Sequence, residues 1–142
     1  MRTILLLGFM ALTQFTSGQN DMLEPYRWEN RLVLLFGSTE DVSVQQQLSE
    51  LEKEPAEITD RDLLIFHIDS KEVRLVNQTT NRSFSADPFR SRYNISKNEF
   101  RYILIGKDGG VKLNKKDFVP NKSLFSIIDA MPMRQREMRE KK

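Results

Sequence analysis

Cysteine is absent from the 142 residues of this chain. Disulfide exchange, thiol peroxidase chemistry and the acylated cysteine of a lipoprotein anchor all require a thiol, so the sequence excludes all three. Small exported animal domains usually depend on disulfides. If this chain is exported, the lack of cysteine therefore favours a bacterial periplasmic or secreted protein.

Histidine is scarce, with His67 as its single instance, and no carboxylates cluster at the spacing of metal ligands. The glycine-rich run Gly106 to Gly110 is similar to a phosphate loop, but it joins two apolar segments and lacks the Lys-Ser/Thr pair that opens a helix. We therefore expect no metal and no cofactor. The net charge of +2, without basic patches between aromatic residues, argues against nucleic acid as a partner.

The N-terminus has the three-part pattern of a signal peptide. Met1-Arg2-Thr3 is a short basic start, residues 4–12 are apolar, and Thr16-Ser17-Gly18 offers small residues for cleavage. The apolar run is too short to span a bilayer comfortably, so no transmembrane anchor is expected. The sequence predicts a signal peptide over 1–18, a domain over 19–132, a basic tail over 133–142, and a periplasmic or secreted location.

Four Asn-x-Ser/Thr sequons would be glycan acceptors in a eukaryotic secretory pathway, whereas in a bacterium they are usually coincidental, the interpretation favoured here. They begin at Asn77, Asn81, Asn94 and Asn121.

Apolar patterning predicts four strands and three helices. Continuous apolar runs indicate buried strands, and apolar residues three or four apart indicate a helix face. Ser38 or Thr39 is expected to cap the first helix and Pro55 to end it, while Pro132 is expected to break or kink the last one. The expected strands are 31–36, 63–68, 100–105 and 111–113, with a hairpin arm over 71–81, a short helix over 86–93 and a final helix around 124–131.

This order gives one strand–helix–strand crossover, then an antiparallel hairpin and a covering helix. The Asp108-Gly109 pair is a strong hairpin signal, because both residues tolerate a positive φ. The prediction is an α/β fold, specifically a thioredoxin-like three-layer sandwich with a mixed central sheet. A flavodoxin-like arrangement fits less well, because a tight turn joins the third and fourth strands.

Three stretches carry a family resemblance: Tyr93-Asn94-Ile95 leading to Phe100, residues 104–112 around the glycine-rich turn, and residues 128–138 around Met131-Pro132-Met133. Together they resemble the P-DUDES family, over roughly Leu23 to Met138. The resemblance implies a thioredoxin-like fold. It also implies a role in adhesion or matrix association, because animal relatives occur in sushi-repeat-containing extracellular matrix proteins. It does not imply an established enzyme.

In active thioredoxins a pair of cysteines lies where the first strand meets the first helix, and a cis-proline precedes the third strand. Here residues 36–41 contain no cysteine, and no proline lies near Arg101. Ser38, Thr39, His67 and Asp69 form an alternative edge site. His67 is interpreted as a structural histidine, a ligand contact or, with Ser38 and Asp69, part of a hydrolase triad. The strand spacing of His67 and Asp69 suits a direct bond poorly.

Two other segments offer candidate binding residues. The turn is expected to expose Lys107, together with Asp108 and Gly109, to a partner. The basic tail, with Arg134, Arg136 and Glu137, is interpreted either as a solvated helical extension or as an anion-binding patch for acidic polysaccharide or phospholipid head groups.

We expect a non-catalytic binding module whose partner is an envelope or extracellular protein or an acidic polysaccharide. A hydrolase or a redox-associated subunit that acts with a cysteine-bearing protein, using the edge near Ser38, His67 and Asp69, is the alternative.

Overall fold

A six-stranded mixed sheet lies at the centre of the computed structural model, which describes residues 21–142. The predicted signal peptide 1–18 lies outside the described residues. Strand β1 pairs in parallel with β2 and antiparallel with β5, and the sheet order is β4-β3-β2-β1-β5-β6. The strands are β1 Arg31–Phe36, β2 Leu63–Ile68, β3 Glu72–Leu75, β4 Phe84–Ser85, β5 Arg101–Ile105 and β6 Val111–Lys115.

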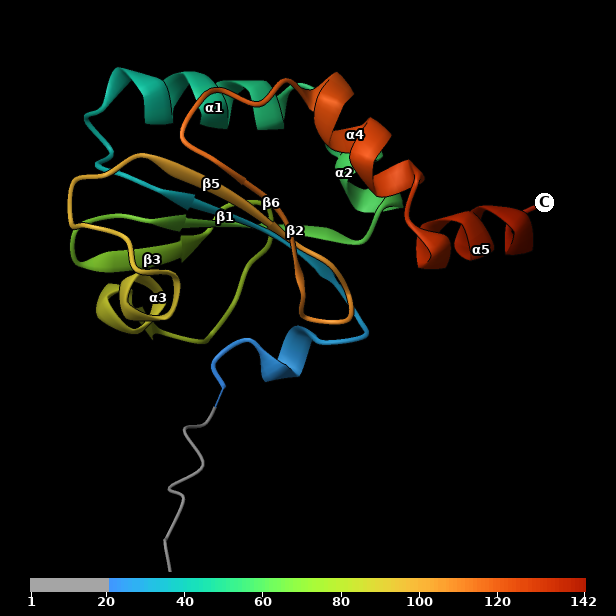
Figure 1. Ribbon diagram of the computed structural model, residues 1–142, viewed down its shortest axis with the longest axis horizontal. Coiled ribbons are helices and arrows are strands. Elements are labelled where there is room, and N and C mark those ends of the chain that lie inside the picture. The colour runs from blue at the N-terminus through green and yellow to red at the C-terminus, as the bar shows by residue number, and fades with distance from the viewer. Residues whose placement is uncertain (1–20) are drawn as a thin grey trace, which may run out of the picture.

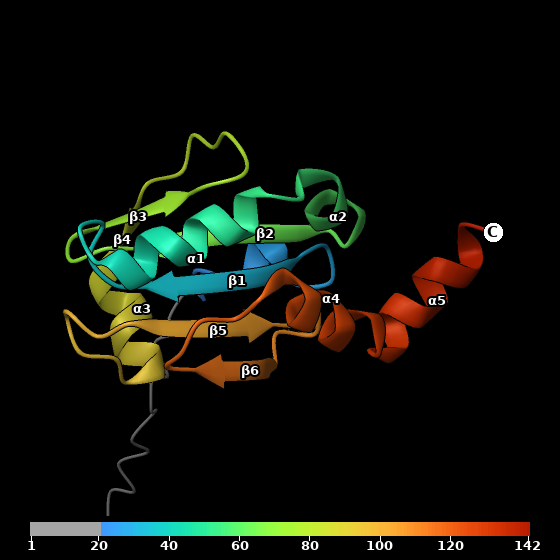
Figure 2. The same ribbon diagram turned by 90° about the horizontal axis from the view of Figure 1, so that it is seen from above.

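Helices cover both faces of this sheet and make three layers (Figure 1). On one face lie α1, α2 and α4, and on the other lie α3 and a short 3-10 helix, η1. Their bounds are η1 Glu24–Tyr26, α1 Val42–Glu52, α2 Pro55–Asp60, α3 Ala86–Tyr93, α4 Asn121–Asp129 and α5 Pro132–Glu140. Seen from above, α5 extends beyond α4 and away from the sheet (Figure 2). None of the helices within residues 21–142 has the length and apolarity needed to cross a membrane.

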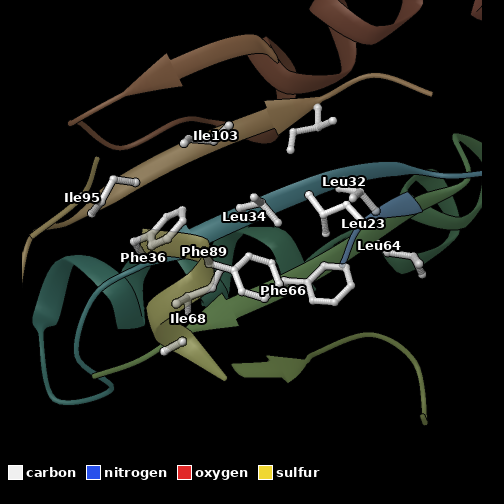
Figure 3. Close-up of a cluster of buried hydrophobic side chains, with 12 residues drawn as sticks. Leu23, Leu32, Leu34, Phe36, Leu64, Phe66, Ile68, Phe89, Ile95 and Ile103 are labelled. Atoms are coloured by element: carbon white, nitrogen blue, oxygen red, sulfur yellow. The ribbon is translucent and has the colours of Figure 1, made fainter. Parts of the chain in front are cut away.

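The two central strands are buried on both faces, as their apolar runs predict. Successive side chains of β1 point to opposite faces, so Leu34 packs toward α3 and Val33 toward α1 and α4. The cluster on the α3 side contains Phe36, Phe66 and Phe89 (Figure 3). Each fully buried side chain of this size contributes about 1.5–3 kcal/mol to folding, so these two clusters stabilise the sheet.

The predicted bounds of β1, β2 and the helix over 86–93 are confirmed, but the start of the first helix is not. Asp41, rather than Ser38 or Thr39, is the N-cap of α1, and its carboxylate accepts a hydrogen bond of 2.8 Å from the Ser43 amide. A carboxylate at the N-cap accepts a hydrogen bond from a free backbone amide, and its negative charge is attracted to the partial positive charge at the start of the helix. Pro55 starts the short helix α2, because proline is well suited to a first helical turn.

Two of the four predicted sequon asparagines have structural roles. The Asn77 side chain bonds to the Ile65 amide and the Leu63 carbonyl, both at 2.8 Å, along strand β2. Asn121 is buried and donates to the Glu50 carbonyl at 2.6 Å. A glycan on either Nδ2 would leave that nitrogen a single N–H and would have to fit beside the chain that it now contacts.

Tyr102 carries a buried hydroxyl without a hydrogen-bond partner among the described residues. Burial also raises the pKa of this phenol. We expect Tyr102→Phe to keep the ring packing and to raise the free energy of unfolding by up to about 1 kcal/mol, because it removes an unpaired buried polar group. Urea unfolding measures this. Tyr93→Phe, at a half-buried tyrosine, is the control and should change stability by less than about 0.5 kcal/mol; a clear loss in Tyr102→Phe would contradict the prediction.

Candidate functional site

Two places at opposite ends of strand β1 hold the candidate residues. The Ser38 edge, made of Ser38, Thr39, His67 and Asp69, lies where β1 ends and the chain turns toward α1. The Trp28 groove lies at the start of β1, between the loop before that strand, the β5–β6 turn and the joint of α4 and α5. Figure 1 shows the turn and the joint at the same end of the sheet.

Gly37 makes the turn at the Ser38 edge. Its φ is +141°, and a Cβ added here would lie 2.6 Å from Cγ2 of Val44, so a side chain would be strained and crowded. The Gly37 carbonyl is a hydrogen-bond acceptor for His67, at 3.0 Å from Nε2. The turn thus places a main-chain acceptor against the histidine ring.

His67 is fully buried and has partners on both ring nitrogens. With Nε2 donating to Gly37, Nδ1 lies 3.4 Å from Nη2 of Arg74 and can accept from it. Burial holds the pKa of His67 below its usual value, so the ring is neutral. Neither nitrogen bonds to Ser38 or Asp69 within the described chain, so the contacts of a Ser-His-Asp triad are not formed. The structural interpretation of His67 fits this geometry.

Asp69 closes the same edge from the other side. Its carboxylate accepts hydrogen bonds from the Thr39 hydroxyl, from the Thr39 amide at 3.3 Å, and from the Ser70 amide. Burial alone would raise the pKa of Asp69, but these bonds bring it below its ordinary value. The sequence correctly grouped Thr39 and Asp69. Because they bond to each other, the edge holds its own anion near the start of α1.

The Trp28 groove has a volume of about 620 Å³. Its floor includes the buried side chains of Arg31 and Lys107, and apolar groups form much of its walls. Its lining residues include Trp28, Arg31, Lys107, Lys112, Met131 and Met133.

Trp28 is 58% exposed, although tryptophan is a residue that folding usually covers. Its φ of 69° lies in the left-handed region, which costs a residue with a side chain about 1–2 kcal/mol. The backbone amide of Trp28 donates to the Lys107 carbonyl at 2.6 Å, and Arg27 stacks 5.5 Å from the ring centre. The chain therefore holds an exposed aromatic side chain on a strained backbone at the mouth of the groove.

Below the groove, Glu137 of α5 binds two cations of the body. Nη1 and Nη2 of Arg31 lie 3.1 and 3.2 Å from the two oxygens of the Glu137 carboxylate. Nζ of Lys107 lies 2.7 Å from the same carboxylate and 2.8 Å from Asp62. Burial would raise the pKa of Glu137, but the bonds from Arg31 and Lys107 hold it below its usual value, so the group stays ionised.

A second set of ion pairs fixes α5 and α2 together. Arg134, only 3% exposed, bonds to Asp129 at 3.1 Å and to the Asp60 carbonyl at 2.9 Å. Arg61 reaches Asp129 at 2.7 Å, and Lys141 reaches Asp60 at 2.7 Å. The whole set, called here the Arg31 cluster, contains five cations, Arg31, Arg61, Lys107, Arg134 and Lys141, and five carboxylates, Glu57, Asp60, Asp62, Asp129 and Glu137.

These contacts correct two expectations. Lys107 was expected to be exposed, but it is 9% exposed because Asp62 and Glu137 draw it inward. Arg134 was expected in a solvated tail or an anion-binding patch, but its guanidinium is buried against internal carboxylates. Asp108, Gly109 and Arg136 are exposed, and Asp108 pairs with Lys112 at 2.9 Å.

Sequence reasoning missed Trp28 and Arg31 as site residues. A single tryptophan in an irregular segment and a charged residue opening an apolar strand were the available signals. Within residues 21–142, no three His, Asp or Glu side chains come close enough together to hold a metal ion.

The fold defines a thioredoxin-like protein. Among solved structures it is similar to the reduced 2-Cys peroxiredoxin of Plasmodium vivax, with 14% identity and a TM-score of 0.57, over 80% of this chain and 84% of the peroxiredoxin. It is also similar to a thioredoxin-fold protein from Helicobacter pylori, with 11% identity and a TM-score of 0.49, over 71% of this chain and 68% of that protein. At these identities the likeness concerns the fold.

Within that fold class, the chain belongs to the family described as domain of unknown function DUF4174, which matches residues 22–137. This range includes the Ser38 edge, Trp28 and Glu137. No curated protein has a sequence that matches this chain.

The burial of His67 predicts a pH dependence of stability. Because its folded pKa is lowered, its contribution is complete above the unfolded value of about 6.5 and is lost as the pH falls below it. We expect the free energy of unfolding to fall between pH 6.5 and 5 in the wild type and to stay flatter in His67→Gln. No other histidine titrates there. Urea unfolding at pH 7.5, 6 and 5 measures this; equal slopes in both proteins would show that His67 is not the cause.

A lower pH window belongs to the Arg31 cluster. Hydrogen bonds from Lys141 and Arg134 lower the pKa of Asp60 to about 2, so its contribution is present above its ordinary value of 3.8 and is lost as the pH falls toward 2. The two windows therefore do not overlap.

Helix α5 carries one buried arginine, Arg134, and one exposed arginine, Arg136, so the effect of a buried charge can be compared with that of an exposed one. We expect Arg134→Ala to destabilise the protein by about 2 kcal/mol, because it removes a buried guanidinium that hydrogen-bonds to both Asp60 and Asp129. Arg136→Ala, on the same helix but exposed, should change stability by less than about 0.5 kcal/mol. Thermal unfolding of both variants checks this, and equal effects would contradict the structural role of Arg134.

Proposed function

We propose that this chain is an exported, non-catalytic protein-binding module that holds its partner in the Trp28 groove. The observation that carries the proposal is Trp28 itself, exposed and held in a left-handed conformation at the mouth of a groove. Backbone strain of this kind persists where the surrounding structure enforces it, and it is concentrated at functional sites. The resemblance to the P-DUDES family, with its adhesion-related animal members, supports the same class of function.

The composition of the groove favours a protein over a polysaccharide as the partner. Met131, Met133 and Ile127 line its walls beside Trp28. Tryptophan, methionine and arginine are enriched at protein interfaces, and methionine adapts its shape to a partner's side chains. An acidic polysaccharide offers no apolar side chains to pack against these walls, whereas a protein partner does.

The opposite end of the domain supports a binding role in another way. Without cysteine, and with His67 and Asp69 engaged in internal hydrogen bonds, the Ser38 edge keeps the thioredoxin-like turn but none of its thiols. Export by the predicted signal peptide 1–18 would place the groove outside the cytoplasm, where cell fractionation with an antibody would detect the chain.

Trp28→Gly tests the proposal, because glycine removes the side chain and relieves the backbone strain. We expect the variant to be as stable as the wild type or more stable by about 1 kcal/mol, while capture of a protein partner from the native envelope fraction falls at least tenfold. Quantitative mass spectrometry of cross-linked eluates measures capture, and urea unfolding measures stability.

Phe118→Ala is the matched control, since Phe118 is another exposed aromatic residue, 46% exposed, outside the groove. It should leave capture unchanged. Undiminished capture by Trp28→Gly would refute the groove as the binding site. Capture that survives protease digestion of the envelope but not polysaccharide lyase would assign the polysaccharide instead.

A further inference from the structure

Arg31 and Lys107 form a pair of buried cations at the floor of the Trp28 groove, 1% and 9% exposed. Both belong to the body of the domain, since Arg31 opens strand β1 and Lys107 lies in the β5–β6 turn. Both also have contacts that do not involve α5. Nη1 of Arg31 donates to the Arg61 carbonyl at 3.0 Å, and Lys107 pairs with Asp62. The sheet and its turn therefore fix the cation pair independently of the last helix.

Glu137 fills the position between these cations as a bound carboxylate would. The two terminal nitrogens of Arg31 face the two carboxylate oxygens, and Lys107 adds a third bond. This fork is the arrangement by which arginine recognises carboxylates in ligands, because it supplies two directed hydrogen bonds as well as charge. Arg31 and Lys107 therefore have the chemistry of a carboxylate site with an internal occupant.

Glu137 lies at the edge of the domain and outside its apolar core. Its side chain is 21% exposed and borders solvent. Helix α5 is also held by Arg134 on Asp60 and Asp129 and by Lys141 on Asp60. No residue of α5 belongs to the two apolar clusters, which end at Met131 among the described residues. Exchange at Glu137 is therefore a local change.

We propose that Arg31 and Lys107 form a carboxylate-binding site that Glu137 occupies in the free protein and that a carboxylate of the protein partner takes over on binding. This inference rests on the proposed function, because the site is the floor of the same groove. A neutral group in place of Glu137 would leave the buried Arg31 guanidinium without a carboxylate partner among the described residues and Lys107 with Asp62 alone, whereas another carboxylate preserves the charge balance. The ligand is an acidic segment with an apolar side chain next to its carboxylate, placed against Trp28 and Met133.

The test uses purified protein and small probes, with fluorescence of the single tryptophan, Trp28, as the readout in the groove. N-acetyl-leucine supplies a carboxylate with an apolar side chain, and N-acetyl-leucinamide is its uncharged match. We expect Glu137→Ala to bind N-acetyl-leucine at least tenfold more tightly than the wild type and to bind the amide no better. Adding Lys107→Ala to that variant should remove most of the gain.

Chemical rescue gives a second readout. Glu137→Ala should unfold at a lower temperature than the wild type, and sodium acetate should restore much of the difference, while sodium chloride at equal ionic strength should not. If Glu137→Ala fails to fold, Glu137→Gln keeps the side-chain size and permits the same binding titration. Glu140→Ala, an exposed position on the same helix, is the control and should behave like the wild type in both measurements.

The probes also distinguish the sources of the carboxylate. If N-acetyl-leucine binds more tightly than N-acetyl-aspartate amide, the partner's carboxylate is a chain terminus. If the order is reversed, the carboxylate is an acidic side chain, and both results support the site. Equal affinities of the wild type and Glu137→Ala, equal binding of acid and amide, or rescue by inorganic phosphate but not by acetate would overturn it. Partner capture is measured separately with Trp28→Gly. If Trp28→Gly loses capture while Glu137→Ala binds N-acetyl-leucine no more tightly than the wild type, the carboxylate site is refuted and the groove is not.

Discussion

The burial of strand β1 on both faces is the constraint on which most of this structure depends. β1 lies between a parallel and an antiparallel neighbour, and helices cover it on both sides. Its first residue, Arg31, is drawn into the interior with the apolar residues that follow. A guanidinium buried in this way must be paired and hydrogen-bonded, because an isolated charge in the interior is very costly. Glu137 of α5 and the Arg61 carbonyl meet that requirement for the two terminal nitrogens, while Nε has no partner among the described residues.

The same requirement explains why the last helix is attached by charge. Helix α5 has the polar sequence Pro-Met-Arg-Gln-Arg-Glu-Met-Arg-Glu and contributes nothing to the apolar clusters. Instead Arg134 is buried between Asp60 and Asp129, so α5 is joined to α2 and α4. An ion pair of this kind can be replaced more easily than apolar packing, because a competing ion can take the place of one of its two charged groups. Pro132 and Met133 at the start of this helix line the Trp28 groove.

The two ends of the sheet differ in how their polar groups are satisfied. At the Ser38 edge, His67 bonds to the Gly37 carbonyl and Thr39 bonds to Asp69, so the turn satisfies these polar groups internally. At the other end Trp28 remains exposed and strained above a groove. The P-DUDES resemblance drew attention to the glycine-rich turn and to the Met131-Pro132-Met133 joint, and the structure places both beside this groove.

The sequence by itself determined the bounds of β1 and β2, the strand–helix–strand order at the start of the domain and the absence of any cysteine thiol. Apolar runs are local, and a missing cysteine cannot be supplied by folding. It did not determine that Lys107 and Arg134 are buried, because their exposure depends on Asp62, Asp60 and Asp129 from other elements. Only the tertiary structure decided the pairing of Arg31 with Glu137, which lie 106 positions apart. Charge pairing over that distance leaves no periodic signal in the sequence, since either residue alone is typical of a protein surface.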